Sequence, residues 1–139
     1  MKRINIDRTK CISCLTCVSA CKVSHNGRVA CNRVVISSKQ LSTPLFCRHC
    51  DLPECTYACP TGAMSQDLQT GYVNYDEKRC AACYMCVMSC SYGVLRADAQ
   101  DPEIIMKCDM CKQHVPAEPQ CVLNCPMKAI TLEEQKEVV

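Results

Sequence analysis

Cysteines recur along this chain in four groups of four, and no other feature of the sequence limits its possible folds as strongly. The 139 residues contain 17 cysteines, above the roughly 8–10% that marks a scaffold held by disulfides or metals. The first and third groups share the spacing C-x2-C-x2-C-x3-C, whereas the gap before the third cysteine widens to four residues in the second group and to nine in the fourth. The groups are Cys11, Cys14, Cys17 and Cys21; Cys47, Cys50, Cys55 and Cys59; Cys80, Cys83, Cys86 and Cys90; and Cys108, Cys111, Cys121 and Cys125. Only Cys31 lies outside them.

The spacing within the groups favours iron–sulfur clusters over zinc. Zinc sites usually close a tetrahedron with two C-x2-C pairs or with histidines at fixed spacing, and they do not need the third and fourth cysteines found here. The run C-x2-C-x2-C-x3-C-P is typical of bacterial ferredoxins, in which the fourth cysteine ligates the other cluster of a pair. Proline follows the fourth cysteine at Pro60 and Pro126, whereas Lys22 and Ser91 stand there in the first and third groups.

The rest of the composition predicts a thin core. Leu, Ile, Val and Phe make up about a fifth of the chain, so metal ligation must help to hold the fold. The charged start MKRINIDRTKC has neither the apolar stretch of a secretory signal nor a twin-arginine pair, and no apolar run approaches the roughly 18 residues of a membrane span. Because thiols stay reduced in the cytosol, these features predict a cytoplasmic protein without a membrane span.

The formal net charge of +2 counts every cysteine as a neutral thiol. If sixteen thiolates hold four oxidised [4Fe-4S] clusters, the loaded protein carries about −6. The sequence therefore predicts no nucleic-acid partner.

Secondary structure is expected to be sparse. Short helical turns are predicted near the third cysteines, at residues 15–20 and 87–89. Short strands are predicted where β-branched or aromatic residues lie near Gly, Asn or Pro: residues 4–6, 34–36, 72–75 and 130–132. The tail TLEEQKEVV, from Thr131, is predicted to be a solvated end.

The order of the four groups, the wide gap in the fourth, and the sequences CRHC, CP and GA in the second resemble the four-cluster ferredoxin-like subunits of redox complexes. Relatives in that family include iron–sulfur subunits of tungsten and molybdenum pterin oxidoreductases, and those serving carbon monoxide dehydrogenase and formate-linked hydrogenase. The resemblance implies an α+β fold with short helices and short antiparallel strands, in which a bacterial two-[4Fe-4S] ferredoxin-like fold is duplicated. An inner module at residues 40–98 would be inserted into an outer module made of residues 1–39 and 99–139.

The same resemblance implies ligand sets that cross between groups. Four sets are expected: set one, Cys11, Cys14, Cys17 and Cys125; set two, Cys47, Cys50, Cys55 and Cys90; set three, Cys80, Cys83, Cys86 and Cys59; and set four, Cys108, Cys111, Cys121 and Cys21. Each set would hold one of four [4Fe-4S] clusters, and the clusters should form a chain.

With four cysteines at every cluster, no iron position is open to a substrate, so we expect an electron-transfer subunit of an anaerobic oxidoreductase complex rather than an enzyme. No Gly-rich phosphate loop or dinucleotide fingerprint supports a nicotinamide or flavin site.

The resemblance implies a larger catalytic redox subunit as partner, either a tungsten or molybdenum aldehyde-type oxidoreductase or carbon monoxide dehydrogenase. The second electron partner would be a ferredoxin, a flavin subunit or a hydrogenase. The alternatives are a structural zinc and cysteine scaffold and a regulatory iron–sulfur protein.

Several side chains near the groups have two open interpretations. Cys31 is either an intermolecular ligand or redox switch, or a small buried apolar residue in a strand, and the buried residue is favoured. His49 either donates an N–H to a cluster sulfur or makes a packing or solvent contact. Four basic residues next to first or second cysteines either offset cluster charge, dock an acidic partner or are ordinary solvated charges: Lys10, Arg48, Arg79 and Lys107.

Overall fold

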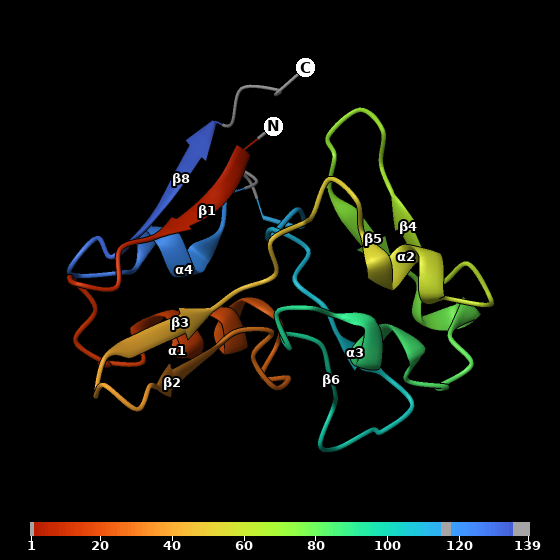
Figure 1. Cartoon of the computed structure of the whole chain (residues 1–139), viewed down its shortest axis with the longest axis horizontal. Helices are drawn as coiled ribbons and strands as arrows, with labels where there is room; N and C mark the ends of the chain where they lie inside the picture. The colour runs from red at the N-terminus through yellow and green to blue at the C-terminus, as the bar shows by residue number, and fades with distance from the viewer. Residues whose placement is uncertain (1, 115–117, 135–139) are drawn as a thin grey trace.

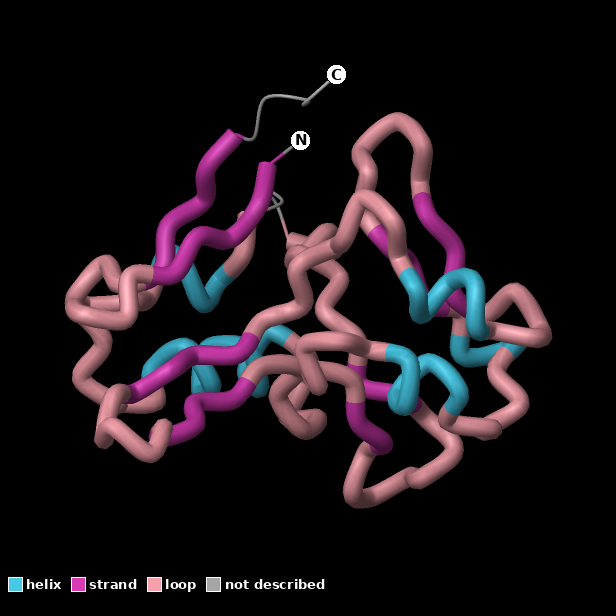
Figure 2. Tube along the Cα trace, in the orientation of Figure 1, coloured by secondary structure: helices cyan, strands magenta, loops and turns pink. Residues whose placement is uncertain are grey.

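The structure is a computed structural model that describes residues 2–114 and 118–134. Short elements are joined by long loops, as the tube in Figure 2 shows. The helices are α1 (Thr16–Ser24), α2 (Glu54–Ala58), α3 (Met85–Ser89) and α4 (Gln120–Leu123), with a 3-10 turn at Glu77–Arg79. The strands are β1 (Lys2–Ile6), β2 (Arg33–Ile36), β3 (Ser42–Leu45), β4 (Met64–Gln66), β5 (Val73–Tyr75), β6 (Arg96–Ala97), β7 (Ile105–Met106) and β8 (Ile130–Glu134). None of these helices is long and apolar enough to cross a membrane.

The strands form antiparallel pairs rather than one sheet. β1 pairs with β8, so that Lys2 lies opposite Glu134 and Ile6 opposite Ile130. This pair joins the two ends of the described chain. The other pairs, β2–β3, β4–β5 and β6–β7, are each formed by consecutive strands.

The elements gather in two lobes, which lie side by side in Figure 1. One lobe contains β1, β8, α1, α4 and the β2–β3 pair, and its two helices contact each other. The other contains α2, α3 and the β4–β5 pair, and there α2 contacts α3. Each lobe therefore brings together two helices that carry cysteines of different groups.

The four helices fall into two kinds, distinguished by how they begin. α1 and α3 each follow a residue in the left-handed region, Leu15 and Tyr84, both with φ of 61°. α2 and α4 each follow a proline, Pro53 and Pro119, whose fixed φ is compatible with the start of a helix. α2 and α4 also lie just before a Cys-Pro pair, and because proline disfavours helical backbone in the residue before it, a helix ends there.

The apolar core is divided into small parts, and each part contains thiols. One surrounds the buried residues Met64, Val73 and Ile105 and includes buried Cys86. A second contains Cys21, Ala30, Cys31 and Met106. In the third, Phe46 and Ile130 pack with Cys121. The expectation of a thin core that the cysteine groups must supplement agrees with this division.

The predicted strands and helical turns are confirmed, with bounds shifted by a few residues at the ends. The prediction for the tail needs correction. Thr131–Glu134 is largely exposed, as expected of a solvated end, but its backbone completes β8 against β1. Residues 135–139 lie outside the described residues.

Candidate iron–sulfur centres

One cavity is lined by three cysteines of the first group together with one from the far end of the chain. Cys11, Cys14 and Cys17 line it from the loop before α1 and the start of that helix, and Cys125 lines it from the residues that follow α4. The remaining lining is mostly apolar and includes Val34, Pro44 and Ile130. The contact of α1 with α4 and the pairing of β1 with β8 bring these distant segments together. All members of set one thus lie around one cavity.

A second cavity is lined by set four. Cys108, Cys111 and Cys121 surround it together with Cys21 from α1. Cys21, Cys111 and Cys121 are buried, so this site is more enclosed than the first, where Cys14 is exposed. Two further cysteines, Cys31 and Cys47, also line it.

Sets two and three meet where α2 contacts α3. Burial raises the pKa of both Cys50 and Cys55, and negative charge on Cys47 and Cys90 raises it further, which reflects their proximity. Burial likewise raises the pKa of Cys86 to about 11, and charges on Cys59 and Cys80 contribute. Cys83 is exposed on the loop between Cys80 and α3.

The backbone before the second cysteine of each group has the same unusual conformation. Ser13, His49, Ala82 and Met110 all have positive φ, between 44° and 58°. Non-glycine residues rarely adopt this conformation, and a turn of this kind directs successive N–H groups into a concavity that suits an anion. Two of these N–H groups already point at sulfur: Ala82 donates to Cys80 Sγ at 3.4 Å, and Met110 to Cys108 Sγ at 3.5 Å.

Most of the enclosed thiols are poor acids on their own. Burial raises the pKa of Cys17 to about 11 and that of Cys108 to about 12, and it raises that of Cys121 as well. Such thiols stay protonated at neutral pH unless a cation displaces the proton. Thiol-lined apolar cavities with converging N–H groups therefore fit [4Fe-4S] clusters, which are held by thiolates and accept hydrogen bonds at sulfur.

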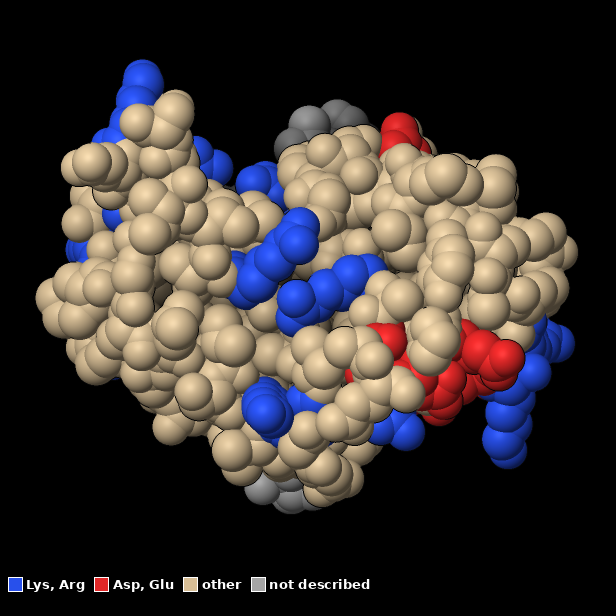
Figure 3. Space-filling model, turned by 90° about the horizontal axis from the view of Figure 1, so that it is seen from below, with Lys and Arg blue, Asp and Glu red and all other residues tan. Residues whose placement is uncertain are grey.

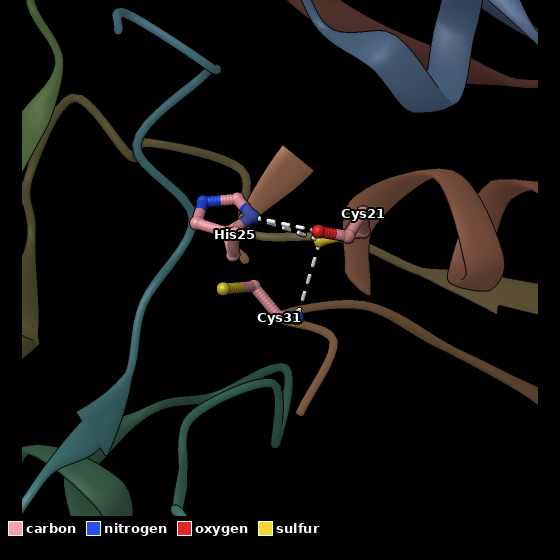
Figure 4. A group of neighbouring side chains, drawn as sticks. All are labelled: Cys21, His25 and Cys31. Atoms are coloured by element: carbon pink, nitrogen blue, oxygen red, sulfur yellow. Dashed lines mark hydrogen bonds between the residues drawn. The ribbon is translucent and has the colours of Figure 1, made fainter. Parts of the chain in front are cut away.

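Cys21 is the exception, because its sulfur is surrounded by donors (Figure 4). The backbone N–H of Cys31 donates to its Sγ at 3.3 Å, and His25 Nδ1 lies 3.7 Å from the same atom. His25 Nε2 contacts the Asp109 carboxylate at 3.2 Å, and the bonds to Asp109 and Cys21 raise the pKa of His25 to about 11. Hydrogen bonds from Cys31 and His25 in turn lower the pKa of Cys21. These hydrogen bonds therefore favour the thiolate form of Cys21.

The role of His25 is not evident from ligand spacing, since no second histidine or acid lies at a ligand-spaced position beside it. A signal was nevertheless present: Cys21 and His25 are four residues apart, a separation that places two side chains on one face of a helix. Cys31 is buried, as favoured from the sequence, but it lies in a bend two residues before β2 and not in a strand. Its thiol donates to the backbone oxygen of Lys107 at 3.4 Å.

His49 is neutral and buried. Burial first, and then the positive charge of Lys107, lower its pKa to about 2. Its Nδ1 accepts the backbone N–H of Val73 at 3.0 Å, which leaves the proton on Nε2. Nε2 is buried without a hydrogen-bond partner among the described residues. The His49 ring therefore packs against Tyr72 and also holds a free Nε2–H donor next to the second cysteine group.

Together these features define a protein whose thiol-lined cavities suit iron–sulfur clusters. Sequence comparison specifies the class further. A model described as a 4Fe-4S dicluster domain matches residues 38–135, and one described as a 4Fe-4S binding domain matches residues 8–24. Because the first covers more than half of the chain, the chain belongs to the 4Fe-4S dicluster family of iron–sulfur electron-transfer proteins.

Curated relatives extend over nearly the whole chain. Electron transport protein HydN of Escherichia coli is 31% identical, and the match covers 95% of this chain and 87% of HydN. An iron–sulfur protein of Rhodospirillum rubrum is 33% identical over 88% of this chain and 76% of its own length. A tetrathionate reductase subunit of Archaeoglobus fulgidus is 33% identical over 80% of this chain and 55% of its own length.

Proposed function

We propose that this chain is an electron-transfer subunit that holds four [4Fe-4S] clusters and passes electrons along them between two redox partners. The observation that carries the proposal is the composition of the two thiol-lined cavities. In each, three cysteines of one group are joined by the fourth cysteine of a distant group, Cys125 in one and Cys21 in the other. Sets one to four are proposed as the ligands, and each bound cluster supplies a one-electron couple.

Contacts between the ligand sets support a linear order. Cys17 and Cys125 of set one pack in the same small core as Cys121 of set four. Cys47 of set two lines the cavity of set four. Cys55 and Cys90 of set two share a core with set three. The proposed path therefore runs through sets one, four, two and three.

The ends of this path are its most accessible points. All cysteines of the chain lie within the described residues. The exposed ones are Cys14 in set one and Cys83 in set three. Electron transfer between proteins requires close approach of the two redox groups, so the surfaces around Cys14 and Cys83 are the proposed docking points. On the face seen in Figure 3, Lys and Arg side chains cross the middle and an acidic patch lies beside them. Such separated charges can orient a partner protein.

A larger catalytic subunit is the proposed partner at one end. The tetrathionate reductase relative is, as its name states, one subunit of an enzyme, which supports this arrangement in general terms. The specific proposal is a tungsten or molybdenum aldehyde-type oxidoreductase or carbon monoxide dehydrogenase, with a ferredoxin, flavin subunit or hydrogenase at the other end. Because iron ligation by thiolates suits a reducing compartment, the proposal locates the complex in the cytoplasm.

The proposed architecture is a duplicated ferredoxin-like fold, with an inner module at residues 40–98 and an outer module formed by residues 1–39 and 99–139. The two lobes and the two kinds of helix support a duplication. The β2–β3 and β6–β7 pairs each extend across one of these boundaries, so the division between modules passes through hairpins rather than through free linkers.

A reductive titration tests the proposal. Anaerobically purified protein, titrated with a low-potential reductant and followed by its visible absorption, should take up about four electrons per chain, one for each cluster. Protein from which iron has been removed serves as the control and should take up none. A colourless, redox-inactive protein containing zinc would instead support a structural scaffold. Uptake of about two electrons after full reconstitution would contradict the four-cluster proposal.

A further inference from the structure

Among the four basic residues that adjoin cysteines, Lys107 has a distinct environment. Lys10, Arg48 and Arg79 are exposed, as expected of ordinary surface charges. Lys107 is buried, with 7% of its surface exposed. A lysine is seldom buried to this degree unless its charge has a partner.

The contacts of the Lys107 ammonium do not include a carboxylate. Its Nζ donates to Cys47 Sγ at 3.1 Å and to the backbone oxygen of Cys108 at 2.9 Å. None of the ion pairs formed within the described residues involves Lys107. The nearest candidate counter-charge is therefore the sulfur of Cys47, which is proposed as a cluster ligand.

Lys107 lies at the junction between two ligand sets. It follows β7 directly and precedes Cys108 of set four. Cys47 of set two lies in the segment after β3, and both segments pass between the two lobes in Figure 1. The Lys107 ammonium thus bonds the side chain of Cys47 in set two and the backbone of Cys108 in set four.

The charge of Lys107 lies beside both sets. Its Nζ is 3.1 Å from the Sγ of Cys47, of set two, and 2.9 Å from the backbone oxygen of Cys108, of set four. A cation whose field reaches two thiolate sets also favours any added negative charge at either site.

We propose that Lys107 is a positioning residue for electron transfer, and that its fixed charge makes the two central clusters, on sets two and four, easier to reduce together. This inference rests on the proposed function. One electron leaves the cluster on one set and arrives at the other, and no bond or proton changes. Because Lys107 contacts both sets, its charge raises both potentials in the same direction, so both central clusters accept an electron more readily.

The experiment compares Lys107→Gln with Lys107→Arg in the complete four-cluster protein, by redox titration followed by electron paramagnetic resonance. Glutamine keeps an N–H donor and removes the charge, whereas arginine keeps the charge. In Lys107→Gln the equilibrium constant for reduction of each central cluster should fall by about tenfold. That fall corresponds to a reduction potential lower by about 59 mV for a one-electron couple. The other two clusters should keep their potentials, and Lys107→Arg should stay close to the unsubstituted protein.

Lys112→Gln is the matched control, because Lys112 is exposed five residues further along the same segment. It should leave all four potentials unchanged. Unchanged potentials in Lys107→Gln, or equal shifts in Lys112→Gln, would overturn the inference while leaving the four-cluster function intact. Loss of the two central clusters in Lys107→Gln would also overturn it, since Lys107 would then be needed for assembly. Absence of four clusters from the unsubstituted protein would instead mark failure of the proposed function.

Discussion

The backbone N–H of Cys31 donates a hydrogen bond to the Sγ of Cys21 at 3.3 Å, across a separation of ten residues. The thiol of Cys31 points elsewhere and donates to the Lys107 backbone oxygen. The sulfur atoms of Cys21 and Cys31 and a ring nitrogen of His25 nevertheless all lie within 4.8 Å of one another, a separation compatible with a shared metal. The backbone of Cys31 thus supports Cys21, a proposed ligand, and the question is whether the thiol of Cys31 replaces Cys21 in that role.

We predict that Cys31→Ala retains all of its iron, because the donor to Cys21 is a backbone group that the substitution keeps. Loss of a small buried thiol should lower the free energy of unfolding by about 1 kcal/mol. Iron content and denaturant titration measure the two effects. Cys21→Ala is the control and should lose or alter one cluster. If Cys31→Ala lost about four iron atoms per chain, Cys31 would be a ligand and the assignment of set four would be wrong.

The sequence was informative wherever chemistry follows from local spacing. The groups identified iron and sulfur, and short runs such as residues 4–6 and 130–132 correctly predicted strands. The partners of those strands were not predictable in the same way, because the β1–β8 pair joins residues more than a hundred positions apart. The pairing of Cys17 with Cys125 around one cavity was expected only from the family resemblance.

Burial is the other property that spacing could not supply. Lys10 and Lys107 both precede the first cysteine of a group, yet Lys10 is exposed and Lys107 is buried. The difference arises because Lys107 lies where segments from both lobes meet, an arrangement set by tertiary contacts. His49 likewise has its hydrogen-bond partner, Val73, on a strand 24 residues away.

We predict that folding depends on the clusters. The apolar cores are small and each contains cysteines, so removal of iron leaves buried thiols around empty cavities and no large core to hold the lobes. Chelation under anaerobic conditions should abolish cooperative thermal unfolding, as followed by circular dichroism. Re-addition of iron and sulfide should restore it. Retention of a native spectrum and a sharp transition by the iron-free protein would show that the clusters do not replace a core.

The proposed crossing of ligands between groups leads to a separate prediction. Cys125→Ser should alter the same paramagnetic resonance as Cys11→Ser, because both residues belong to set one and line one cavity. Cys21→Ser should alter the resonance that Cys108→Ser alters. Serine is close in size to cysteine but is a harder ligand, so it changes one cluster without opening a large cavity. If Cys125→Ser instead matched Cys108→Ser, each group would bind its own cluster, and the crossed architecture would have to be abandoned.

The number of clusters is the claim on which the whole account depends, and metal analysis tests it most directly. Protein purified without oxygen, and fully reconstituted, should contain about sixteen iron and sixteen acid-labile sulfide per chain, as four [4Fe-4S] clusters require. Iron and sulfide should be measured together with zinc on the same sample. A reproducible content near eight iron per chain, or zinc in place of iron, would contradict the account.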